Sequence, residues 1–494
     1  MSTGKATIHR LATGVAGLDA ILGGGLPELS FNIIAGPPGS GKTTLAHQLM
    51  FALATPERPA LYFTVLGEPP LKMLRYQQQF DFFDTTLLNV AVRFVNLGEE
   101  TAAGDLDRVL ARIVAEVAAC GPGLVFIDSF RSVMLASQDA GNASIGLQQF
   151  TQKLGVLMTS WQATTFLIGE YFSDSDPNPV FTVADGILWL RQSEQRNSVV
   201  RKLEVTKMRG QPSMTGLHTF RIGNAGIQVF APAMVTVAPE SPGSWPITER
   251  LGMGVPGLDG MMGGGLPRGY SLLIAGPSGS GKSIMAAAFL VEGARAGETG
   301  VIAAFEQRAH RSRGEAIAGL VEDGRIGVVE TRQFDLSVAE IAALVIAEVQ
   351  RLGATRIVID SLSGFELSLA PTFREDFREA MARMMVALAN TGATVLMTSE
   401  LEDRYDSLRF SPYGTAFLTD AIIVQRYIEV DSRLQRVLAV VKVRSSTHSS
   451  ELRLFHIDAD GIRIGEMLAD QEGLLGGRPT RVRVDCDNGA ADDG

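Results

Sequence analysis

Cysteine is scarce in this chain, and long apolar runs are missing. The 494 residues include two cysteines, Cys120 and Cys486, which lie far apart and form no CxxC or zinc-type spacing. This pattern argues against a disulfide framework and fits a reducing compartment. The N-terminal segment lacks the apolar stretch of a secretory signal. No apolar run reaches the roughly 18 residues of a membrane helix. We therefore predict a soluble, cytoplasmic protein with no membrane partner.

Basic residues are also in the minority. The chain has 44 Lys and Arg against 54 Asp and Glu, a formal charge of −10. Proteins that bind nucleic acid usually carry a basic surface, so a nucleic-acid partner is disfavoured. The apolar share of 46% and the charged share of 20% are ordinary for a globular protein. The length fits two large α/β domains.

Three short motifs occur twice at one constant spacing. GVAGLD returns as GVPGLD, GGGLP returns unchanged, and GPPGSGKT returns as GPSGSGKS, always 240 residues later (14 to 254, 23 to 263, 36 to 276). Such a long period is that of a whole domain, so the sequence predicts a duplicated domain. We expect the domains at residues 8–232 and 250–468, a linker at 233–249 rich in Pro and Ser, and a mobile tail at 469–494.

Apolar strands alternate with helices inside each copy. Strands are expected at LSFNIIAG, ALYFTV, LVFID and TTFLIG in the first copy, and at SLLIAG, VIAAF, RIVID and TVLMTS in the second. Because these runs are apolar throughout, both faces of each sheet should be covered. The predicted fold class is therefore α/β, with two mostly parallel sheets flanked by helices and late strand pairs at one sheet edge.

The strongest chemical signal is a P-loop in each copy. Both loops match GxxxxGK[ST], between an apolar strand and a helix-competent stretch. Their glycines allow backbone N–H groups to converge on phosphate oxygens, at the positive end of the following helix dipole. Lys42 and Lys282 would reach the β- and γ-phosphates of ATP, and Thr43 and Ser283 would bind Mg²⁺. The predicted nucleotide-binding residues are Gly36, Pro37, Pro38, Gly39, Ser40, Gly41, Lys42, Thr43 and Thr44, and Gly276, Pro277, Ser278, Gly279, Ser280, Gly281, Lys282, Ser283 and Ile284.

An aspartate ends a later apolar strand in each copy. LVFID places Asp128 there and RIVID places Asp360, and each is followed by Ser. In a P-loop site this aspartate would hold Mg²⁺, directly or through a water molecule. The alternative is a helix N-cap, since Asp-Ser is a common capping pair.

Hydrolysis also requires a group that orients or deprotonates water. We expect it at the end of the strand beside the P-loop strand, which indicates Glu68 in LYFTVLGE and Glu306 in VIAAFE. The alternative for each is a solvated loop residue.

With these residues in place, the chain resembles the KaiC family of RecA-like ATPases. The resemblance spans nearly all of both copies and includes a late KxR element, KMRG at 207–210 and KVRS at 442–445. It implies a RecA-like fold, ATP and Mg²⁺ as ligands, and a homohexameric ring with nucleotide between subunits. It also implies that Lys207, Arg209, Lys442, Arg444 and the downstream His448 face a neighbour's γ-phosphate, with Ser213 at the corresponding place in the first copy. The alternative is that these are ordinary strand-surface charges.

The sequence departs from the clock members of the family at two places. Their paired glutamates are replaced by Gly67-Glu68 and Glu306-Gln307, so one carboxylate remains per site. Their phosphorylated Ser-Thr pair is replaced by Ala416-Phe417, which leaves Thr415 and Thr419 nearby. The resemblance therefore implies a KaiC-like regulatory or signalling ATPase, with an unidentified regulatory protein partner, rather than a clock oscillator.

Three alternatives remain open at this point. One is a serine/threonine autokinase, and another is a RecA-like DNA-handling ATPase. The third is a scaffold in which ATP holds a ring together without turnover.

Overall fold

The computed structural model describes most of both predicted domains. It covers residues 8–65, 75–102, 106–130, 143–171, 179–195, 198–231, 249–305, 314–330, 336–369, 371–374, 377–401, 418–430, 432–459, 461–467, 471–472 and 480–481. The chain forms two compact units, Met1–Pro232 and Ala233–Gly494. Except for Glu249, the predicted linker lies outside the described residues, as do Glu68, Glu306, Thr415, Ala416 and Phe417.

The first unit is built on a nine-stranded sheet in the order β11-β10-β9-β8-β3-β7-β6-β4-β5. From β5 to β8 the neighbouring strands are parallel, and β9 to β11 continue the sheet as antiparallel neighbours at one edge. The strands are β3 (Phe31–Gly36), β4 (Ala60–Thr64), β5 (Val92–Asn96), β6 (Leu124–Asp128), β7 (Thr164–Glu170), β8 (Gly186–Gln195), β9 (Ser198–Met208), β10 (Leu217–Gly223) and β11 (Gly226–Phe230).

The second unit repeats this sheet strand for strand. Its order is β16-β15-β17-β18-β14-β19-β20-β21-β22, with the P-loop strand β14 in the place of β3. The strands are β14 (Ser271–Gly276), β15 (Gly300–Ala304), β16 (Ile326–Glu330), β17 (Arg356–Asp360), β18 (Thr394–Glu400), β19 (Ala421–Val430), β20 (Arg433–Val443), β21 (Arg453–Asp458) and β22 (Gly461–Met467).

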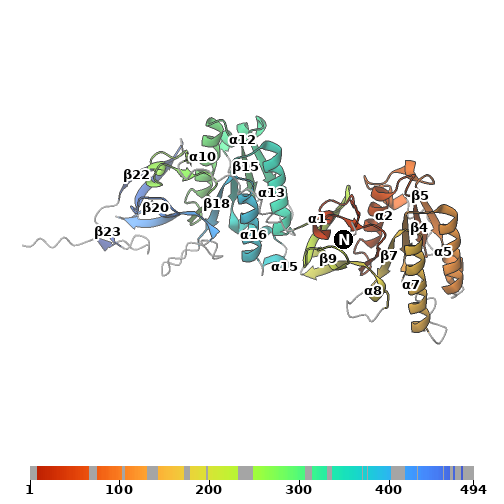
Figure 1. Ribbon diagram of the computed structural model, residues 1–494. Helices are drawn as coiled ribbons and strands as arrows, with labels where there is room; N and C mark the ends of the chain where they lie inside the picture. Colours follow the sequence, from red (N-terminus) through yellow and green to blue (C-terminus); the bar gives the residue numbers. More distant parts are fainter. Residues whose placement is uncertain are drawn as a thin grey trace, which may run out of the picture. The chain divides into compact units, whose positions relative to one another are not determined.

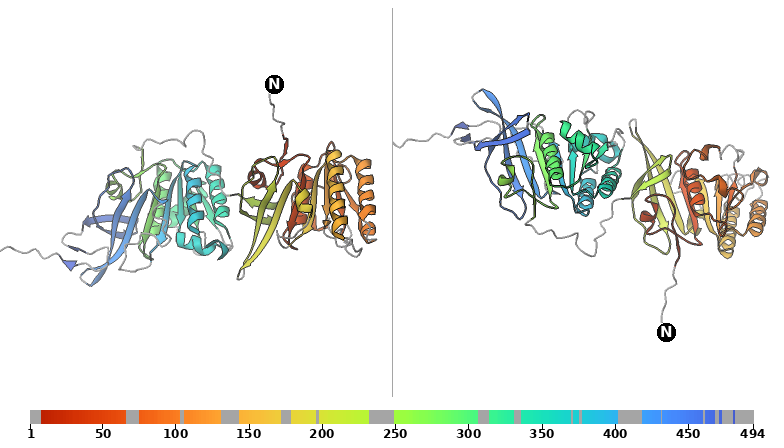
Figure 2. Two further views of the ribbon diagram at one scale, coloured as in Figure 1. Left: turned by 60° about the horizontal axis from the view of Figure 1, so that its bottom comes forward. Right: turned by 90° about the horizontal axis from the view of Figure 1, so that it is seen from above.

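Helices cover both faces of each sheet, as Figures 1 and 2 show. In the first unit, α2 packs on one face and α5 and α7 pack on the other. In the second unit, α10 and α12 occupy one face and α13, α14 and α16 the other. The helices are α1 (Leu18–Leu22), α2 (Lys42–Leu53), α4 (Gly98–Ala102), α5 (Leu106–Cys120), α7 (Ala143–Ser160), α8 (Pro179–Val183), α9 (Leu258–Met261), α10 (Lys282–Arg295), α12 (Gly314–Glu322), α13 (Val338–Leu352), α14 (Leu362–Ser368), α15 (Pro371–Arg374) and α16 (Phe377–Ala389), with a 3₁₀ turn η1 at Thr85–Leu87.

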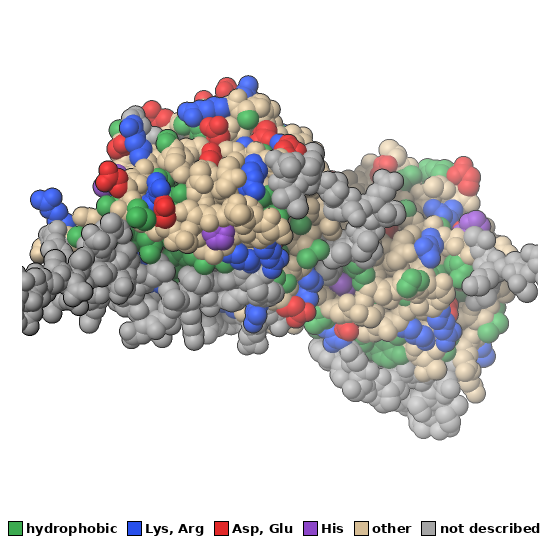
Figure 3. Space-filling view, turned by 60° about the vertical axis from the view of Figure 1, so that its left-hand side comes forward, with side chains coloured by type: hydrophobic (Ala, Val, Ile, Leu, Met, Phe, Trp, Pro, Cys, Tyr) green, Lys and Arg blue, Asp and Glu red, His purple; other side chains and the backbone are tan. Residues whose placement is uncertain are grey.

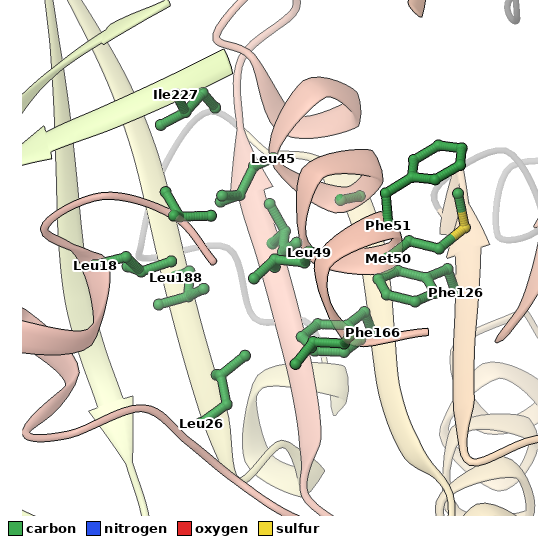
Figure 4. Close-up of a cluster of buried hydrophobic side chains, with 14 of the residues drawn as sticks. Leu18, Leu26, Leu45, Leu49, Met50, Phe51, Phe126, Phe166, Leu188 and Ile227 are labelled. Atoms are coloured by element: carbon green, nitrogen blue, oxygen red, sulfur yellow. The ribbon is translucent and has the colours of Figure 1, made fainter. Parts of the chain in front are cut away.

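Burial on both faces explains the unbroken apolar strands. Every residue of β3, β4 and β14 is buried. On the α2 face, Leu45, Leu49 and Met50 lie against the sheet beside Phe126 and Phe166 (Figure 4). The two phenyl rings stack with centroids 4.6 Å apart. The predicted fold class, two mostly parallel sheets covered by helices, is confirmed.

The repeated GVxGLD and GGGLP motifs lie in a short segment before each P-loop strand, and a two-residue antiparallel strand pair closes that segment. β1 (Arg10–Leu11) pairs with β2 (Leu26–Pro27), and β12 (Arg250–Leu251) pairs with β13 (Leu266–Pro267). The motif aspartate closes the intervening loop, since Asp19 accepts from the Thr13 N–H and Asp259 from the Met253 N–H, each at 2.9 Å. These motifs therefore act structurally, by fixing the chain as it enters the sheet.

Of the predicted tail, the described parts are β23 (Gln471–Glu472) and β24 (Thr480–Arg481), which pair antiparallel. Among the described residues, no helix is both long enough and apolar enough to span a bilayer.

Candidate nucleotide sites

The first candidate site begins where β3 ends. Gly39 and Gly41 have φ values of 73° and 101°, in the left-handed region that favours glycine. A Cβ on Gly41 would lie 2.8 Å from Cδ1 of Ile222 on β10, so the packing also requires glycine there. The loop therefore has the curved backbone that a phosphate group needs, and α2 begins at Lys42 with its N-terminus at this curve.

The second P-loop has the same conformation. Gly279 and Gly281 have φ values of 74° and 100°. A Cβ on Gly281 would lie 2.7 Å from Cδ1 of Ile457 on β21. Beneath this loop, the buried Ser280 hydroxyl donates to Oε1 of Gln425 at 2.9 Å, while Ser278 and Gly279 are exposed at its tip. The two P-loops, one in each unit, therefore have the same backbone conformation.

Both P-loop lysines lie across their own loops. Nζ of Lys42 donates to the Pro37 carbonyl at 2.8 Å, and Nζ of Lys282 donates to the Pro277 carbonyl at 2.7 Å. Burial lowers the pKa of Lys42, while the nearby carboxylates of Glu170 and Asp128 act in the opposite direction. The ammonium groups are therefore held inside the curve that phosphate oxygens would enter.

The side chain of Asp128 contacts the P-loop hydroxyl. The Oγ1 of Thr43 donates to Oδ2 of Asp128 at 2.9 Å, and the Tyr62 hydroxyl on β4 donates to the same oxygen at 2.8 Å. Burial raises the pKa of Asp128, and the hydrogen bonds from Tyr62 and Thr43 and the charge of Lys42 counteract that effect. A carboxylate and a hydroxyl are hard oxygen ligands of the kind that Mg²⁺ prefers.

Asp360 occupies the same place in the second unit but has a different partner. Its Oδ1 accepts a hydrogen bond from the Thr398 hydroxyl on β18. Within the described part of the chain, no hydrogen bond joins Ser283 to Asp360. The cap of α14 is provided by Ser361, whose side chain accepts from the Gly364 N–H at 3.2 Å, so the capping alternative does not account for Asp360.

The two KxR elements make matching contacts within their own units. Lys207 donates to the carbonyls of Phe181 and Thr182, and Lys442 donates to the carbonyl of Thr419. A β-bulge lies beside each lysine, between Ile187 and Leu188 on β8 and between Ile422 and Ile423 on β19. Bulges redirect neighbouring side chains, so both lysines leave the regular pleat at the same point.

The arginines of these elements pair with aspartates that hold the P-loop strands. Arg209 contacts Asp185 at 3.1 Å, and Arg444 contacts Asp420 at 3.2 Å. Asp185 and Asp420 also accept from the first N–H groups of β3 and β14, at Phe31 and Ser271, each at 3.0 Å. Both arginines are more than half exposed. His448 and Ser213 lie half-buried in the segments that follow β20 and β9.

The strand register places Lys207 and Arg209 near the start of β3, whereas the P-loop follows the end of that strand. Lys207 lies opposite Ile187, which is level with Ile33 near the start of β3, whereas the P-loop leaves β3 at Gly36. Arg209 is tied through Asp185 to Phe31, five residues before Gly36. At about 3.3 Å per residue the separation along the strand is about 16 Å. Within one unit, Arg209 therefore cannot contact a phosphate held by that unit.

Comparison with known protein families identifies the same family in both units. The family model for KaiC ATPases matches residues 11–234 and again residues 251–469. This chain belongs to the KaiC ATPase family. The two α/β units are thus tandem RecA-like domains of a family whose members bind and hydrolyse ATP.

The chain is also similar along its length to individual KaiC proteins. The circadian clock oscillator protein KaiC of Picosynechococcus sp. is 25% identical over 492 residues, which cover 97% of this chain and 94% of that protein. The KaiC of Rippkaea orientalis is 26% identical over 495 residues, with 97% and 93% covered. KaiC 1 of Synechocystis sp. is 26% identical over 492 residues, also with 97% and 93% covered.

One topological expectation for this KaiC-family chain was wrong. The strand that leads toward Glu68 was expected beside the P-loop strand, but β7 and β6 stand between β3 and β4. In the second unit β18 and β17 likewise separate β14 from β15. The error arose because order along the chain does not reveal which crossovers skip a strand. Glu68 and Glu306 lie outside the described residues, so their roles stay predictions.

The strand beside each P-loop strand ends in a different glutamate. Glu170 on β7 is level with Gly36, and Glu400 on β18 is level with Gly276. The charge of Glu170 raises the pKa of both Lys42 and Asp128, so it lies within electrostatic reach of the site. Sequence reasoning did not select these residues. The signal was available, because TTFLIGE and TVLMTSE both end in glutamate.

The sequence also did not indicate four other residues of these sites, which are Tyr62, Thr398, Asp185 and Asp420. Tyrosine and threonine are ordinary strand residues, so their hydroxyls gave no local signal. The two aspartates recur just before equivalent strands, which a position-by-position comparison of the copies could have detected.

A metal at these sites would depend on the nucleotide. Among the described residues, no cluster of three or more His, Cys, Asp or Glu side chains could hold a metal ion by itself. Mg²⁺ commonly binds through one or two protein oxygens together with substrate phosphates and water. Thr43 with Asp128 fits that mode, and Ser283 and Asp360 take the corresponding places at the start of α10 and the end of β17.

Proposed function

We propose that this protein is a Mg²⁺-dependent ATP hydrolase with one site in each domain. Its domains are taken as 8–232 and 250–468. The observation that carries the proposal is the 2.9 Å contact between Thr43 and Asp128, behind a P-loop whose lysine already lies inside the curve. Family membership supports ATP as the nucleotide.

The residues of the first site divide the work by position. The amides of the loop and Lys42 hold the β- and γ-phosphates. Thr43 and Asp128 hold Mg²⁺, which when bound neutralises charge on the phosphates. Glu68 orients the attacking water. Ser283, Asp360, Lys282 and Glu306 take these parts in the second site. Such catalysis works through positioning and charge neutralisation rather than covalent chemistry.

We further propose that the chain assembles into an ATP-dependent homohexameric ring. Lys207, Arg209, Lys442, Arg444 and His448 would then face a phosphate bound by the neighbouring copy. The support is the register, which keeps Arg209 about 16 Å along the strand from its own P-loop. In this proposal the ring is a cytoplasmic regulatory or signalling switch that responds to nucleotide and acts on a protein partner.

Lysine substitution tests the proposed ATP site. Lys42→Ala and Lys282→Ala each remove a charged partner of phosphate, and hydrogen bonds to charged groups contribute about 1.5–3 kcal/mol. We expect each change to weaken one of the two ATP-binding events about 10- to 150-fold in calorimetry of the full chain, with a matching loss of phosphate release. Lys153→Ala on α7, a surface lysine, is the control and should bind as the unmodified chain does. Unchanged ATP binding in the Lys42→Ala, Lys282→Ala double variant would falsify the proposal.

The ring requires a separate measurement. Native mass measurement with and without ATP should show monomers without nucleotide and six copies with it. A single mass under both conditions would reject the nucleotide-dependent ring and leave the hydrolase proposal standing.

The autokinase alternative has an observation against it. Thr419, one of two threonines near the Ala416-Phe417 positions, is fully buried, and its carbonyl accepts from Lys442. A buried hydroxyl is not accessible to a phosphoryl donor. Incubation with γ-labelled ATP should therefore label free phosphate and not Thr419, and label on Thr415 would favour the kinase.

The DNA-handling alternative has weak support. On the face drawn in Figure 3, basic and acidic side chains are interspersed over the described surface. Salt-dependent binding of oligonucleotides would nevertheless favour that alternative. The scaffold alternative predicts assembly with ATP but no phosphate release, even from the unmodified chain. Hydrolysis predicts phosphate release that is lost in Glu68→Gln and Glu306→Gln while assembly is retained.

A further inference from the structure

The two metal-binding aspartates are held by different neighbours. In the first unit the Tyr62 hydroxyl on β4 donates to Oδ2 of Asp128 at 2.8 Å. In the second unit the Thr398 hydroxyl on β18 donates to Oδ1 of Asp360. Tyr62 and Thr398 are both fully buried, so neither bond competes with bulk water.

The sheet register shows that the donor has changed sides between the copies. Asp128 lies opposite Ile168 on β7, and Asp360 takes the equivalent place beside Thr398 on β18. On the other side of Asp128 is β4, where Thr64 is its partner and Tyr62 lies two residues earlier. On the other side of Asp360 is β15, where Ala304 is its partner and Ile302 lies two residues earlier. Each site therefore has one hydroxyl donor and one isoleucine, in opposite arrangements.

This arrangement fixes the two carboxylates differently. Oδ2 of Asp128 accepts from both Tyr62 and Thr43, so this carboxylate is tied to the P-loop hydroxyl before any metal arrives. The bond from Thr398 instead ties Asp360 to the strand beside the P-loop strand. Groups that orient a ligand carboxylate commonly change metal affinity by 10–100-fold when removed.

We propose that Tyr62 and Thr398 are positioning residues that hold Asp128 and Asp360 for the metal, and that they give the two sites different metal affinities. The first site, with its hydroxyl and carboxylate already joined, binds the metal more tightly. The inference rests on the proposed function, because it takes the two aspartates as metal ligands.

The test measures metal binding and not turnover. Mn²⁺ replaces Mg²⁺ as the probe, and its free concentration is followed by electron paramagnetic resonance in the full chain with a saturating non-hydrolysable ATP analogue. The unmodified chain should bind two Mn²⁺ ions with distinct affinities. Tyr62→Phe should weaken the tighter of the two about tenfold, and Thr398→Val should weaken the other by a similar factor.

Matched variants separate positioning from general damage. Thr398→Ser keeps the hydroxyl and should retain the affinity of the second site. Adding Ile168→Thr to Tyr62→Phe transfers the donor arrangement of the second site to the first and should restore at least part of the lost affinity. Binding of the analogue in EDTA should be unchanged in every variant, because the P-loop itself is untouched.

The possible results lead to separate conclusions. Unaltered Mn²⁺ affinity in both Tyr62→Phe and Thr398→Val overturns the inference and leaves the hydrolase proposal intact. Loss of analogue binding in EDTA also overturns it, because that result assigns the two residues a structural role. If the unmodified chain binds neither the analogue nor Mn²⁺, the proposed function itself fails.

Discussion

Thr43 and Asp128 lie 85 residues apart in the sequence, and their side chains meet at 2.9 Å. The first comes from the start of the P-loop helix and the second from the end of β6, with β7 between that strand and β3. This contact joins the P-loop to the aspartate that we propose as a ligand of Mg²⁺. In the second domain Ser283 likewise lies at the start of the P-loop helix and Asp360 likewise ends β17, with β18 between that strand and β14, but Asp360 accepts from Thr398.

The Thr43 hydroxyl should therefore be more important than the rest of its side chain. Thr43→Val keeps the shape and removes both the metal ligand and the hydrogen bond to Asp128. We expect at least a tenfold rise in the Mg²⁺ concentration required for half-maximal phosphate release at the first site. Thr43→Ser should behave as the unmodified chain, since the second domain uses Ser283. Equal behaviour of the Val and Ser variants would contradict this role.

His47 provides a pH dependence that is independent of catalysis. Its ring is fully buried on α2 and lies 4.6 Å from the ring of Tyr62 and 6.0 Å from that of Phe94. Burial lowers the pKa of His47 to about 4 from the ordinary 6.5. Between these pH values the unfolded chain binds a proton that the folded chain does not, so the free energy of unfolding falls as the pH drops.

The expected loss is about 3 kcal/mol when the pH falls from about 6.5 to about 4. His47→Phe keeps an aromatic ring and removes the titration, so it should flatten this part of the stability profile. Urea denaturation of the nucleotide-free protein at several pH values measures the effect. A profile with the same slope in both proteins would show that other groups dominate the acid sensitivity.

The parts that could be predicted from sequence are those with a local signature. The P-loops need glycine, lysine and a hydroxyl residue within eight positions, and the aspartates follow short apolar strands. Strand order has no such signature, which is why the strands before Glu68 and Glu306 were placed beside the wrong neighbours. Tyr62 and Thr398 look like ordinary strand residues until the register brings their hydroxyls to Asp128 and Asp360.

A buried ion pair distinguishes the second domain from the first in stability. Arg356 is 2% exposed, and its Nε lies 2.5 Å from Oε2 of Glu298. Its Nη1 donates to the carbonyls of Gly252 and Phe289. Removal of one partner from a buried pair leaves an uncompensated charge, which typically costs about 3–5 kcal/mol. Glu298→Gln should therefore destabilise the second domain by about that amount.

The first domain suggests how to rescue this loss. Leu124 pairs with Ala60 where Arg356 pairs with Gly300. Adding Arg356→Leu to Glu298→Gln should recover part of the stability, because the buried Arg356 charge is gone. Arg268, which also pairs with Glu298, keeps its contact with Glu249. Glu348→Gln breaks a surface pair with the largely exposed Arg351 and should change little. Chemical denaturation of the unmodified chain, Glu298→Gln, the double variant and Glu348→Gln measures these differences. A double variant as unstable as Glu298→Gln would show that the unpaired Arg356 charge does not cause the loss.

Arg209 gives the sharpest prediction about assembly. Asp185 holds it near Phe31, at the end of β3 opposite Gly36, so it cannot act on the phosphate of its own P-loop. The proposed ring supplies a phosphate from another copy. Arg209→Ala should lower phosphate release by the first domain at least tenfold, in line with the loss of one or two charge-assisted bonds. ATP affinity at low protein concentration, where copies are separate, should not change.

Mixing two inactive variants tests this directly. In a background with Lys282→Ala to silence the second site, Arg209→Ala chains keep a working first P-loop and Lys42→Ala chains keep a working arginine. Where a P-loop from the first kind meets an arginine from the second, a complete site forms, so the mixture should hydrolyse ATP faster than either variant alone. The gain should vanish on dilution below the assembly concentration. If instead the mixture gave only the average of its components at every concentration, Arg209 would be an ordinary surface charge paired with Asp185.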